Sequence, residues 1–461
     1  MNFSHGDEET IIARCTPQGS GAIALLRLSG KNSVEIAHAM SILPGKKSLL
    51  LEPTHTIHYG FVVDAQGNHI DQVLFLLMRG PHTFTGQDTV EITSHNNPFL
   101  IEQIIQRALT LGARIAHEGE FTKRAMLNGK IDLLQAEAIN DLINANTQLS
   151  LKQSLSQLEG SFSHQLHAIE KELLKALAFC EASFEFIDEE MEFGGRIQEI
   201  INNVLCTVQT LKNNYDQQQQ IRQGVRIALL GSVNAGKSSL FNALLQKERS
   251  IVTEIAGTTR DTVEAGLYRN GNYWTLVDTA GLRVTNDVVE QEGIRRSFEE
   301  ANLADIVILV IDSSRTITPD ELSVYQQIIS HHPNKIIFVG TKTDLPRIAN
   351  PLLDTADCPV LLVSSTHKTN IAILEQKIQE KITALFSALD SPFLLNKRQY
   401  NLLVALENKL RALSPLFDEQ IAYELLSVHL NDALAHTAEL TGKSISEAAM
   451  DAVFREFCVG K

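Results

Sequence analysis

The fold is decided by the stretch RIALLGSVNAGKSSLFNALL (226–245), in which an apolar run leads through a glycine-rich loop into a helical pattern. The loop GSVNAGKS (231–238) fits the phosphate-loop pattern GxxxxGK[ST], and the flanking strand and helix are the context that this motif requires. Glycine lets backbone N–H groups turn toward phosphate oxygens, and the helix start adds positive charge. Lys237 is therefore predicted to reach the β- and γ-phosphates, and Ser238 to bind Mg²⁺.

The chain around this loop falls into four segments of different pattern. Residues 221–386 alternate apolar strands with helix-like segments, which is typical of a doubly wound parallel sheet. Residues 1–119 contain short β-like runs and one helical stretch, and they predict an α+β domain. Residues 120–220 and 387–461 have apolar positions at helical spacing. We therefore expect a multidomain α/β protein in which a doubly wound domain is inserted into a helical domain.

The composition restricts the class of protein further. The 461 residues, 44% of them hydrophobic, allow roughly three domains with cores. No apolar run reaches about 18 residues and the start does not resemble a signal peptide, so we expect a cytoplasmic protein without membrane spans. The net charge of −15 means that any nucleic-acid partner would need a local basic patch. The five cysteines form no CxxC pair, which supports neither disulfides nor a zinc site.

Three further motifs follow the phosphate loop in the order of a Ras-like G domain. GTTRD (257–261) offers hydroxyl groups, with Thr259 as the expected magnesium ligand, and DTAG (278–281) ends a strand and can sense the γ-phosphate. TKTD (341–344) can read guanine. The sequence therefore predicts a GTPase. From these motifs and, for residues 253–256, from a family resemblance given below, the residues predicted to contact GTP are Asn234, Ala235, Gly236, Lys237, Ser238, Ser239, Thr253, Glu254, Ile255, Ala256, Gly257, Thr258, Thr259, Asp278, Thr279, Ala280, Gly281, Thr341, Lys342, Asp344, Ser364, Ser365 and Thr366.

The base-reading motif departs from the usual NKxD. Asp344 can accept hydrogen bonds from guanine, and the stem of Lys342 can lie along the base. Thr341 offers one hydroxyl group where asparagine would offer an amide that both donates and accepts. We expect guanine specificity to be retained, with a lower affinity.

The water-activating residue is ambiguous from the residues alone. Leu282 stands where Ras-type enzymes carry a glutamine that orients the attacking water, and leucine cannot do this. Asp287, Glu290 and Glu292 follow as acidic candidates of equal standing.

Two other segments allow two interpretations each. The tract DQQQQ (216–220) is either a hinge or a polar helix end. The chain ends in DAVFREFCVGK (451–461), after a capping-box pattern formed by Ser444 with Glu447. Met450, Val453, Phe454 and Phe457 share one face of the expected helix, which predicts packing. Cys458 is either a small buried residue or a reactive thiol.

The chain resembles the MnmE (TrmE) family of tRNA-modification GTPases over nearly its whole length. The similarity is carried by TPQGSGAIALLRLSG, GPHTFTGQDTVEI, EGEFTKRAMLNGKIDLLQAEAINDLI, NAGKSSLFNAL, SIVTEIAGTTRDTV, DTAGLR and the final FCVGK. The resemblance implies a homodimer with an N-terminal tetrahydrofolate-binding domain, a helical domain and an inserted G domain. It also implies a flavoprotein partner, MnmG, and tRNA as the substrate.

The activity that the resemblance implies is a potassium-activated GTPase. Together with MnmG, it would add an aminomethyl or carboxymethylaminomethyl group to C5 of the wobble uridine of certain tRNAs. The one-carbon unit would come from methylene-tetrahydrofolate, and the folate site would accept the 5,10-methylene or 5-formyl form.

The resemblance also assigns roles to particular residues. The potassium ligands would be Asn234, Thr253, Ile255 and Thr258, and this ion would neutralise charge where other GTPases use an arginine. Glu290 matches the family's catalytic glutamate, and Arg283 matches an arginine of its moving switch region. With Lys237 and Cys458 they complete the candidate catalytic residues.

The folate residues that match are Arg27, Glu91, Lys130 and Lys461. A pterin calls for a carboxylate partner and the folate glutamate tail for cations, which this set provides. SHNNP (94–98) departs from the family's usual HGGP, so Asn96 and Asn97 add side chains where two glycines would leave the backbone bare, and we expect a different local loop geometry.

Two other functions remain open from the sequence. One is a regulatory GTPase that binds ribosomes or membranes and has lost folate chemistry, which only the TKTD and SHNNP departures favour. The other is a folate-dependent methyltransferase with an inactive G domain, which the complete set of phosphate-contacting residues disfavours.

Overall fold

The structure is a computed structural model, and the ranges in which it describes the chain are 9–185, 193–213, 215, 218–219, 222, 224–245, 263–279, 298–354, 360–387, 393–417 and 421–461. The chain forms two compact units. The first consists of Met1–Asn140, Leu155–Val208 and Asn401–Lys461, and the second of Asp141–Ser154 and Gln209–Tyr400. The first unit is thus built from chain on both sides of the second.

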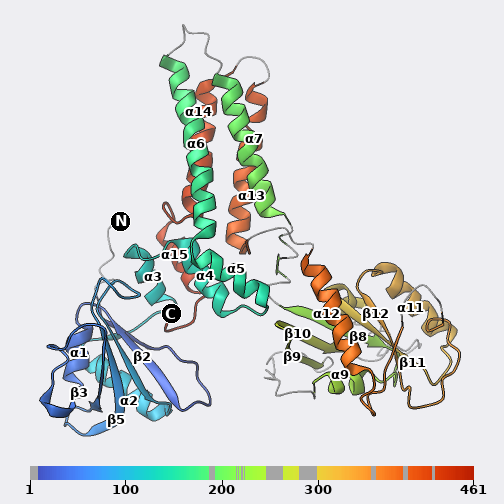
Figure 1. The fold of residues 1–461 in the computed structure, drawn as a ribbon. Coiled ribbons are helices and arrows are strands. Elements are labelled where there is room, and N and C mark those ends of the chain that lie inside the picture. The colour runs from blue at the N-terminus through green and yellow to red at the C-terminus, as the bar shows by residue number, and fades with distance from the viewer. Residues whose placement is uncertain are drawn as a thin grey trace. The chain divides into compact units, whose positions relative to one another are not determined.

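The first unit begins with a seven-stranded sheet in the order β3-β4-β5-β6-β2-β1-β7 (Figure 1). All neighbouring strands are antiparallel except β1 and β7, which are parallel. Its elements are β1 (Ile11–Arg14), β2 (Ile23–Ser29), α1 (Ser33–Ala39), β3 (Ser41–Ile42), a 3₁₀ turn (Pro44–Lys46), β4 (Thr56–Val63), β5 (His69–Met78), β6 (Thr89–His95), α2 (Pro98–Thr110) and β7 (Arg114–Ile115).

Alternation along the strands gives this sheet one buried core face and a second face that carries polar side chains together with exposed apolar ones, such as Ile23, Ile57 and Leu74. In β2, Ala24, Leu26 and Leu28 are fully buried in a core that also contains residues of α1 and α2. Arg27 lies between them in sequence, and a strand sends alternate side chains to opposite faces. Arg27 therefore leaves the core face and is available to a site on the other side.

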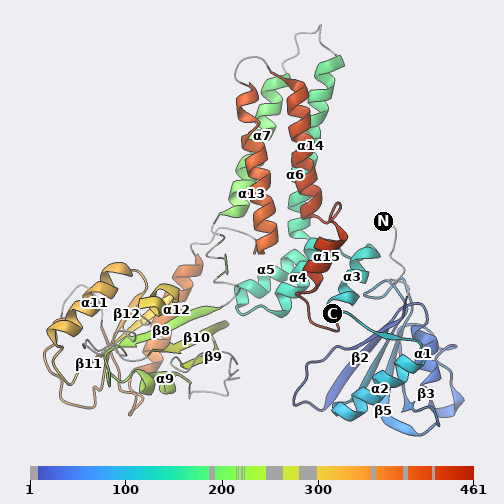
Figure 2. The same ribbon diagram turned by 180° about the vertical axis from the view of Figure 1, so that it is seen from behind.

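The rest of the first unit is helical. Figures 1 and 2 show α6 and α14 side by side, with α7 and α13 running along them. Apolar positions at helical spacing bury the inner faces, for example Leu166, Ile169 and Leu173 on α6. The helices are α3 (Glu120–Leu127), α4 (Leu133–Ile143), α5 (Gln148–Leu158), α6 (Ser161–Glu185), α7 (Phe193–Lys212), α13 (Lys397–Arg411), a 3₁₀ turn (Ser414–Phe417), α14 (Tyr423–Leu440) and α15 (Glu447–Phe454), of which α4, α5, α7 and α13 extend across the unit boundaries.

The last helix begins differently from the sequence prediction. α15 is capped by Ser446, whose side chain accepts a hydrogen bond from the N–H of Ala449, so the predicted capping box of Ser444 with Glu447 is wrong. The packing prediction is confirmed for Met450, Phe454 and Phe457, which are buried together against Ala136 of α4. Ser444 and Ser446 are both residues that can cap a helix, and the capping-box pattern pointed to Ser444, whereas the helix begins after Ser446.

The second unit contains a six-stranded sheet in the order β13-β12-β11-β8-β10-β9. All pairs are parallel except β9 with β10. Buried residues of α9 and α12 cover one face and those of α11 the other, so the predicted doubly wound fold is confirmed. Its elements are β8 (Val225–Gly231), α9 (Lys237–Leu245), β9 (Val263–Arg269), β10 (Asn272–Asp278), β11 (Ile306–Asp312), α11 (Pro319–His331), β12 (Ile336–Thr341), β13 (Leu361–Leu362) and α12 (Ile371–Ser387).

Two residues of the DQQQQ tract are held firmly at the edge of this unit. Gln218 is 1% exposed, and its side chain accepts a hydrogen bond from the N–H of Leu395 at 3.0 Å. The amide of Gln219 donates to the carbonyl of the same leucine at 3.2 Å. The two chain segments that enter and leave the second unit are therefore tied together here.

Candidate functional site

The phosphate loop follows β8, a strand with five consecutive buried residues at its end. Asn234 and Gly236 both have positive φ, 61° and 94°, which curls the loop before α9 begins at Lys237. The Lys237 ammonium is buried and donates to the carbonyl groups of Gly231 and Ser232, each at 3.0 Å. Burial lowers the pKa of Lys237, and the Asp278 carboxylate partly opposes this. The Lys237 ammonium group is therefore held against the backbone of the phosphate loop itself.

The carboxylate of Asp278 fits a divalent cation. It ends β10, where it pairs in register with Leu229 of β8 and so lies beside the phosphate loop. Its Oδ1 is buried without a hydrogen-bond partner in the described part of the chain. A buried carboxylate oxygen is costly unless a cation or water satisfies it. Among the residues present, Asp278 and the Ser238 hydroxyl suit Mg²⁺, which prefers oxygen ligands.

The residues predicted to read the base lie at the ends of β12 and β13. The Thr341 hydroxyl is buried and lies within hydrogen-bond distance of the carbonyl groups of Ala235 and Ile311. Thr341 therefore ties TKTD to the phosphate loop through a hydroxyl group in place of an amide. Asp344 accepts from the Ser364 hydroxyl at 2.8 Å, and this bond holds the pKa of Asp344 below its ordinary value. The Asp344 carboxylate thus stays an acceptor.

Two residues that sequence reasoning missed hold the phosphate loop from behind. The buried hydroxyl of Tyr325 in α11 accepts the N–H of Ser232 at 2.8 Å. Arg315 donates to the Ser232 hydroxyl at 2.7 Å and is itself paired with Glu321. Burial raises the pKa of Tyr325, which keeps its hydroxyl neutral. Both residues lie far along the chain from the loop, and no local motif marks them.

Several predicted residues lie outside the described ranges. They are Thr253, Glu254, Ile255, Ala256, Gly257, Thr258, Thr259, Ala280, Gly281, Arg283 and Glu290, together with the alternatives Asp287 and Glu292. Their assignments to potassium, magnesium, the γ-phosphate and catalysis remain predictions. The remaining predicted GTP contacts all lie in the second unit.

A second cluster forms on the face of the N-terminal sheet opposite its core. Arg27 of β2 is the register partner of Glu91 of β6, and its Nε donates to the carboxylate at 2.8 Å. The Arg27 guanidinium lies over the rings of Phe84 and Phe121, at 5.7 and 5.5 Å from their centroids. The side chains of Arg27 and Glu91 are both less than one-fifth exposed. The pair is therefore a partly buried charge site next to aromatic surface.

The C-terminal residue belongs to the same neighbourhood. The Lys461 carbonyl accepts the N–H of Phe121 at 3.1 Å. Burial raises the pKa of the Cys15 thiol, while the charges of Arg27 and Lys461 act in the opposite direction. A Cβ at Gly460 would lie 3.0 Å from Cα of Cys15, and Arg27 is the register partner of Ala13, so both cations lie close to Cys15 along the chain and across the sheet. The apolar ending of the chain is thus held against the N-terminal domain.

Lys130 reaches this region from the end of α3. Its Cε lies 3.2 Å from the position that a Cβ at Gly86 would occupy, so Lys130 packs over the turn that follows Phe84. Three of the four predicted folate residues therefore gather around Cys15, and the fourth lies on the adjacent turn. Sequence reasoning missed Cys15, Phe84 and Phe121.

The SHNNP segment is well accommodated. The Asn96 side chain accepts from Arg14 at 3.0 Å and donates to the Gly19 carbonyl at 2.9 Å. Asn97, at φ −115°, caps α2 by accepting the N–H of Phe99. Neither residue has the positive φ that would favour glycine. Asparagine therefore replaces glycine here through side-chain hydrogen bonds.

Cys458 does not pack in a core. Its side chain is exposed, so its interpretation as a small buried residue is wrong. The backbone at this point is fixed, because the Cys458 carbonyl accepts from Gly119 and Lys461 at 3.4 and 3.3 Å. A reactive thiol at this position remains a prediction.

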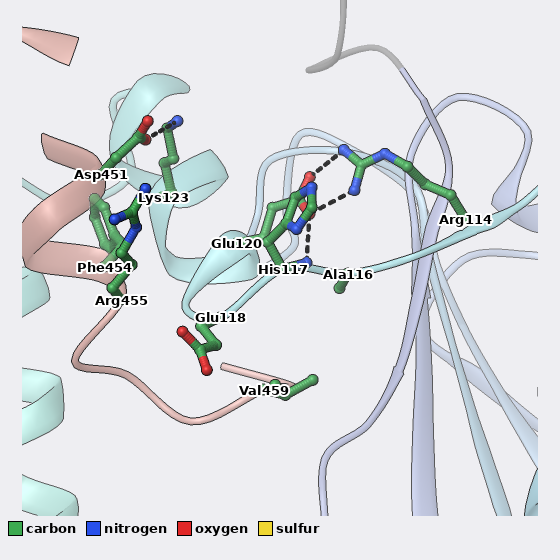
Figure 3. A pocket seen from close by; sticks show the side chains of 10 residues that line it. All are labelled: Arg114, Ala116, His117, Glu118, Glu120, Lys123, Asp451, Phe454, Arg455 and Val459. Carbon is green, nitrogen blue, oxygen red and sulfur yellow. Dashed lines mark hydrogen bonds and ion pairs between the residues drawn. The ribbon is translucent and has the colours of Figure 1, made fainter. Parts of the chain in front are cut away.

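A cavity of about 670 Å³ lies where the segment after β7 meets the C-terminal helix (Figure 3). Its walls contain two ion pairs, Arg114 with Glu120 at 2.6 Å and Lys123 with Asp451 at 2.8 Å. Burial alone would raise the pKa of Glu120, but hydrogen bonds from Arg114 and the His117 N–H lower it to about 2. Within the first unit, the first ion pair joins β7 to α3, and the second joins α3 to α15.

The second unit has the features of a P-loop GTPase. A doubly wound sheet runs into a GxxxxGKS loop, the DTAG aspartate lies beside that loop, and TKTD contacts it through Thr341.

Comparison with known families identifies the group to which the whole chain belongs. Residues 133–458 match the model of the MnmE helical domain, and residues 10–130 match that of the GTP-binding protein TrmE N-terminus. The tRNA modification GTPase MnmE of Christiangramia forsetii is 34% identical over 98% of this chain and 99% of its own length. The corresponding protein of Aquifex aeolicus is 36% identical over 98% and 100%. The chain belongs to the MnmE family of tRNA-modification GTPases.

Solved structures and membrane content complete the comparison. The G domain of the T. maritima FeoB iron transporter is 30% identical and covers 34% of this chain and 98% of its own, with a TM-score of 0.27. None of the helices in the described ranges combines the length and apolar content that a membrane span requires.

Proposed function

We propose that the chain is a potassium-activated GTPase that acts with the flavoprotein MnmG on the wobble uridine of certain tRNAs. The reaction adds an aminomethyl or carboxymethylaminomethyl group to C5 of the uridine, with a one-carbon unit from methylene-tetrahydrofolate. The observation that carries this proposal is the match to MnmE proteins along practically the entire length of both partners. The chain acts as a homodimer in the cytoplasm.

The G domain supplies binding and charge stabilisation for GTP hydrolysis. Lys237 would contact the phosphates, and Ser238 and Thr259 would hold Mg²⁺. Potassium, when bound by Asn234, Thr253, Ile255 and Thr258, neutralises charge that develops on the phosphates.

Glu290 orients the attacking water, and Arg283 belongs to the switch region around it. Leu282 cannot supply the polar group that this task needs, which supports a role for an acid further along the segment.

The folate site is formed by Arg27, Glu91, Lys130 and Lys461. A charge pair beside two aromatic rings supports a flat, polar ligand with a carboxylate tail, since rings stack on the flat part and cations pair with the tail. Cys458, exposed on an anchored backbone, is the candidate thiol of this site.

The cation assignment is tested by GTP turnover in potassium and in sodium at equal ionic strength. We expect turnover to be at least about 10-fold faster in potassium, because a positioned cation replaces a stabilising arginine. Glu290→Ala should abolish turnover and leave GTP binding intact, and Glu292→Ala is the matched control. Equal rates in both salts would refute the potassium site, and loss of GTP binding in Glu290→Ala would make that residue structural.

A further inference from the structure

The β9–β10 hairpin lies in sequence between the motifs GTTRD and DTAG, here called the two switch motifs, and its tip is joined to the connection between α4 and α5. The Tyr273 N–H donates to the Asn146 carbonyl, and the Gln148 N–H donates to the Gly271 carbonyl, both at 2.8 Å. Thr147 and Asn272 form an antiparallel bridge between these bonds. The connection thus adds a short strand segment to β10, next to the point where β8 begins to pair at Trp274.

The contact is closely packed. Thr147 is 4% exposed and Asn272 7% exposed. Gly271 has φ +79°, and a Cβ there would lie 2.3 Å from Cδ of Gln148, so only glycine fits without displacing that side chain. The Thr147 hydroxyl also accepts the N–H of Ser150 at 3.0 Å in the first turn of α5. The hairpin tip and the start of α5 are therefore fixed to each other.

The opposite end of the hairpin reaches the nucleotide motifs. β9 begins at Val263, two residues after the last residue of GTTRD, and β10 ends at Asp278, the first residue of DTAG. The strands pair without interruption from Asn272 with Arg269 to Asp278 with Val263. At about 3.3 Å per residue, this ladder spans roughly 20 Å as one hydrogen-bonded body. A shift of either switch motif acts directly on one end of it.

A second contact attaches the same connection to the second unit. Asp141, at the end of α4, forms an ion pair with Arg222, just before β8. Residues Asp141–Ser154 accordingly belong to the same compact unit as the nucleotide domain, although they precede it in sequence. Both α4 and α5 continue from there into the first unit.

We propose that the β9–β10 hairpin is the element that couples the nucleotide state to the α4–α5 connection, with Gln148 as a positioning residue. Because the hairpin is paired along its whole length, a displacement at the phosphates is passed to residues 146–148 and not absorbed between them. This inference rests on the proposed GTP hydrolysis for its driving force, and it adds the route by which the nucleotide state leaves the G domain.

The test uses Gln148→Pro in the full chain, with Gln148→Ala as the matched control. Gln148 is the first residue of α5, where helices tolerate proline well, so Gln148→Pro removes the N–H bond to Gly271 with little effect on the helix. Gln148→Ala keeps that bond. Amide hydrogen exchange of residues 133–158 is measured with GDP and with a non-hydrolysable GTP analogue.

In the unmodified chain and in Gln148→Ala, exchange should differ between the two nucleotides by about 5-fold or more. In Gln148→Pro the difference should disappear at 141–154, while both nucleotides bind with unchanged affinity. Gly271→Ala, which breaks the contact from the hairpin side, should behave like Gln148→Pro and serves if that variant does not fold. A response retained in both variants, or no response in the unmodified chain, would overturn the coupling. Failure of tRNA modification would leave these exchange results unaffected, so the two proposals are separable.

Discussion

Tyr325 and Arg315 hold the phosphate loop in place, although neither belongs to a nucleotide-binding motif of the sequence. Both act on Ser232, one through its backbone N–H and the other through its hydroxyl. A loop N–H that points away from the phosphates needs an acceptor of its own, because a buried unpaired donor is costly. The neutral tyrosine hydroxyl provides it.

Tyr325→Phe should destabilise the phosphate loop, because it removes the acceptor of the Ser232 N–H. It leaves the Ser232 N–H buried without an acceptor, which costs about 1–3 kcal/mol in the free energy of unfolding. GDP and GTP affinities should fall together, since both nucleotides use the loop. Calorimetric titration measures this, with Tyr59→Phe, an exposed tyrosine of the other unit, as the control. Selective loss of GTP affinity would show that Tyr325 acts on the γ-phosphate and not on the loop.

Arg27→Ala should remove folate binding without affecting GTP hydrolysis. The substitution leaves the Glu91 carboxylate without its cation and exposes the facing aromatic rings, so affinity for 5-formyl-tetrahydrofolate should fall by at least about 30-fold. Equilibrium dialysis measures it. Arg79→Ala, which breaks a looser ion pair with Asp88 at 3.9 Å, is the control. If Arg27→Ala binds folate normally, the site lies elsewhere.

Among the elements, the strands could be predicted best, because alternation and turn residues are local signals. The short β-like runs expected in residues 1–119 include β4 (Thr56–Val63), and the one expected helical stretch is α2, although α1 (Ser33–Ala39) forms there as well. The phosphate loop was predictable for the same reason. The cap of α15, the roles of Tyr325 and Arg315 and the exposure of Cys458 were not, since each depends on contacts between distant parts of the chain.

The ion pair between Glu120 of α3 and Arg114 of β7 predicts that the free energy of unfolding depends on pH in the acidic range. Glu120 has a pKa of about 2 in the folded chain, against 4.5 for the ordinary group. Its charge therefore stabilises the fold fully above pH 4.5, and this stabilisation is lost as the pH falls toward 2. Glu120→Gln should lower the free energy of unfolding by on the order of 3 kcal/mol at neutral pH and by progressively less below pH 4.5.

Urea unfolding at several pH values between 7 and 3 measures this effect. The exposed Glu447 provides Glu447→Gln as a control that should show a small difference at every pH. Glu120 pairs with Arg124 at 2.8 Å as well as with Arg114. A difference between Glu120→Gln and the unmodified chain that stays constant with pH would mean that these two ion pairs are not its source.

At the scale of the whole molecule, the sequence indicated an inserted nucleotide domain from the order of its patterns. It gave no sign that residues 141–154 would pack with that domain, since the main contact of Asn146–Gln148 to the hairpin is made by backbone groups and Arg222, the ion-pair partner of Asp141, lies 81 residues further along the chain. Backbone hydrogen bonds carry no signature in side-chain types. The route from the nucleotide to the helices therefore required the structure.

The central claim is that this chain uses GTP and a folate one-carbon unit to modify tRNA. The direct test combines the purified chain, MnmG, methylene-tetrahydrofolate, GTP, potassium and an unmodified tRNA, followed by mass spectrometry of the wobble nucleoside. We predict a C5-aminomethyl-type uridine when all components are present, and unmodified uridine when the chain, GTP or the folate is omitted. Unmodified uridine in the complete mixture, with GTP hydrolysed and MnmG active, would contradict the account.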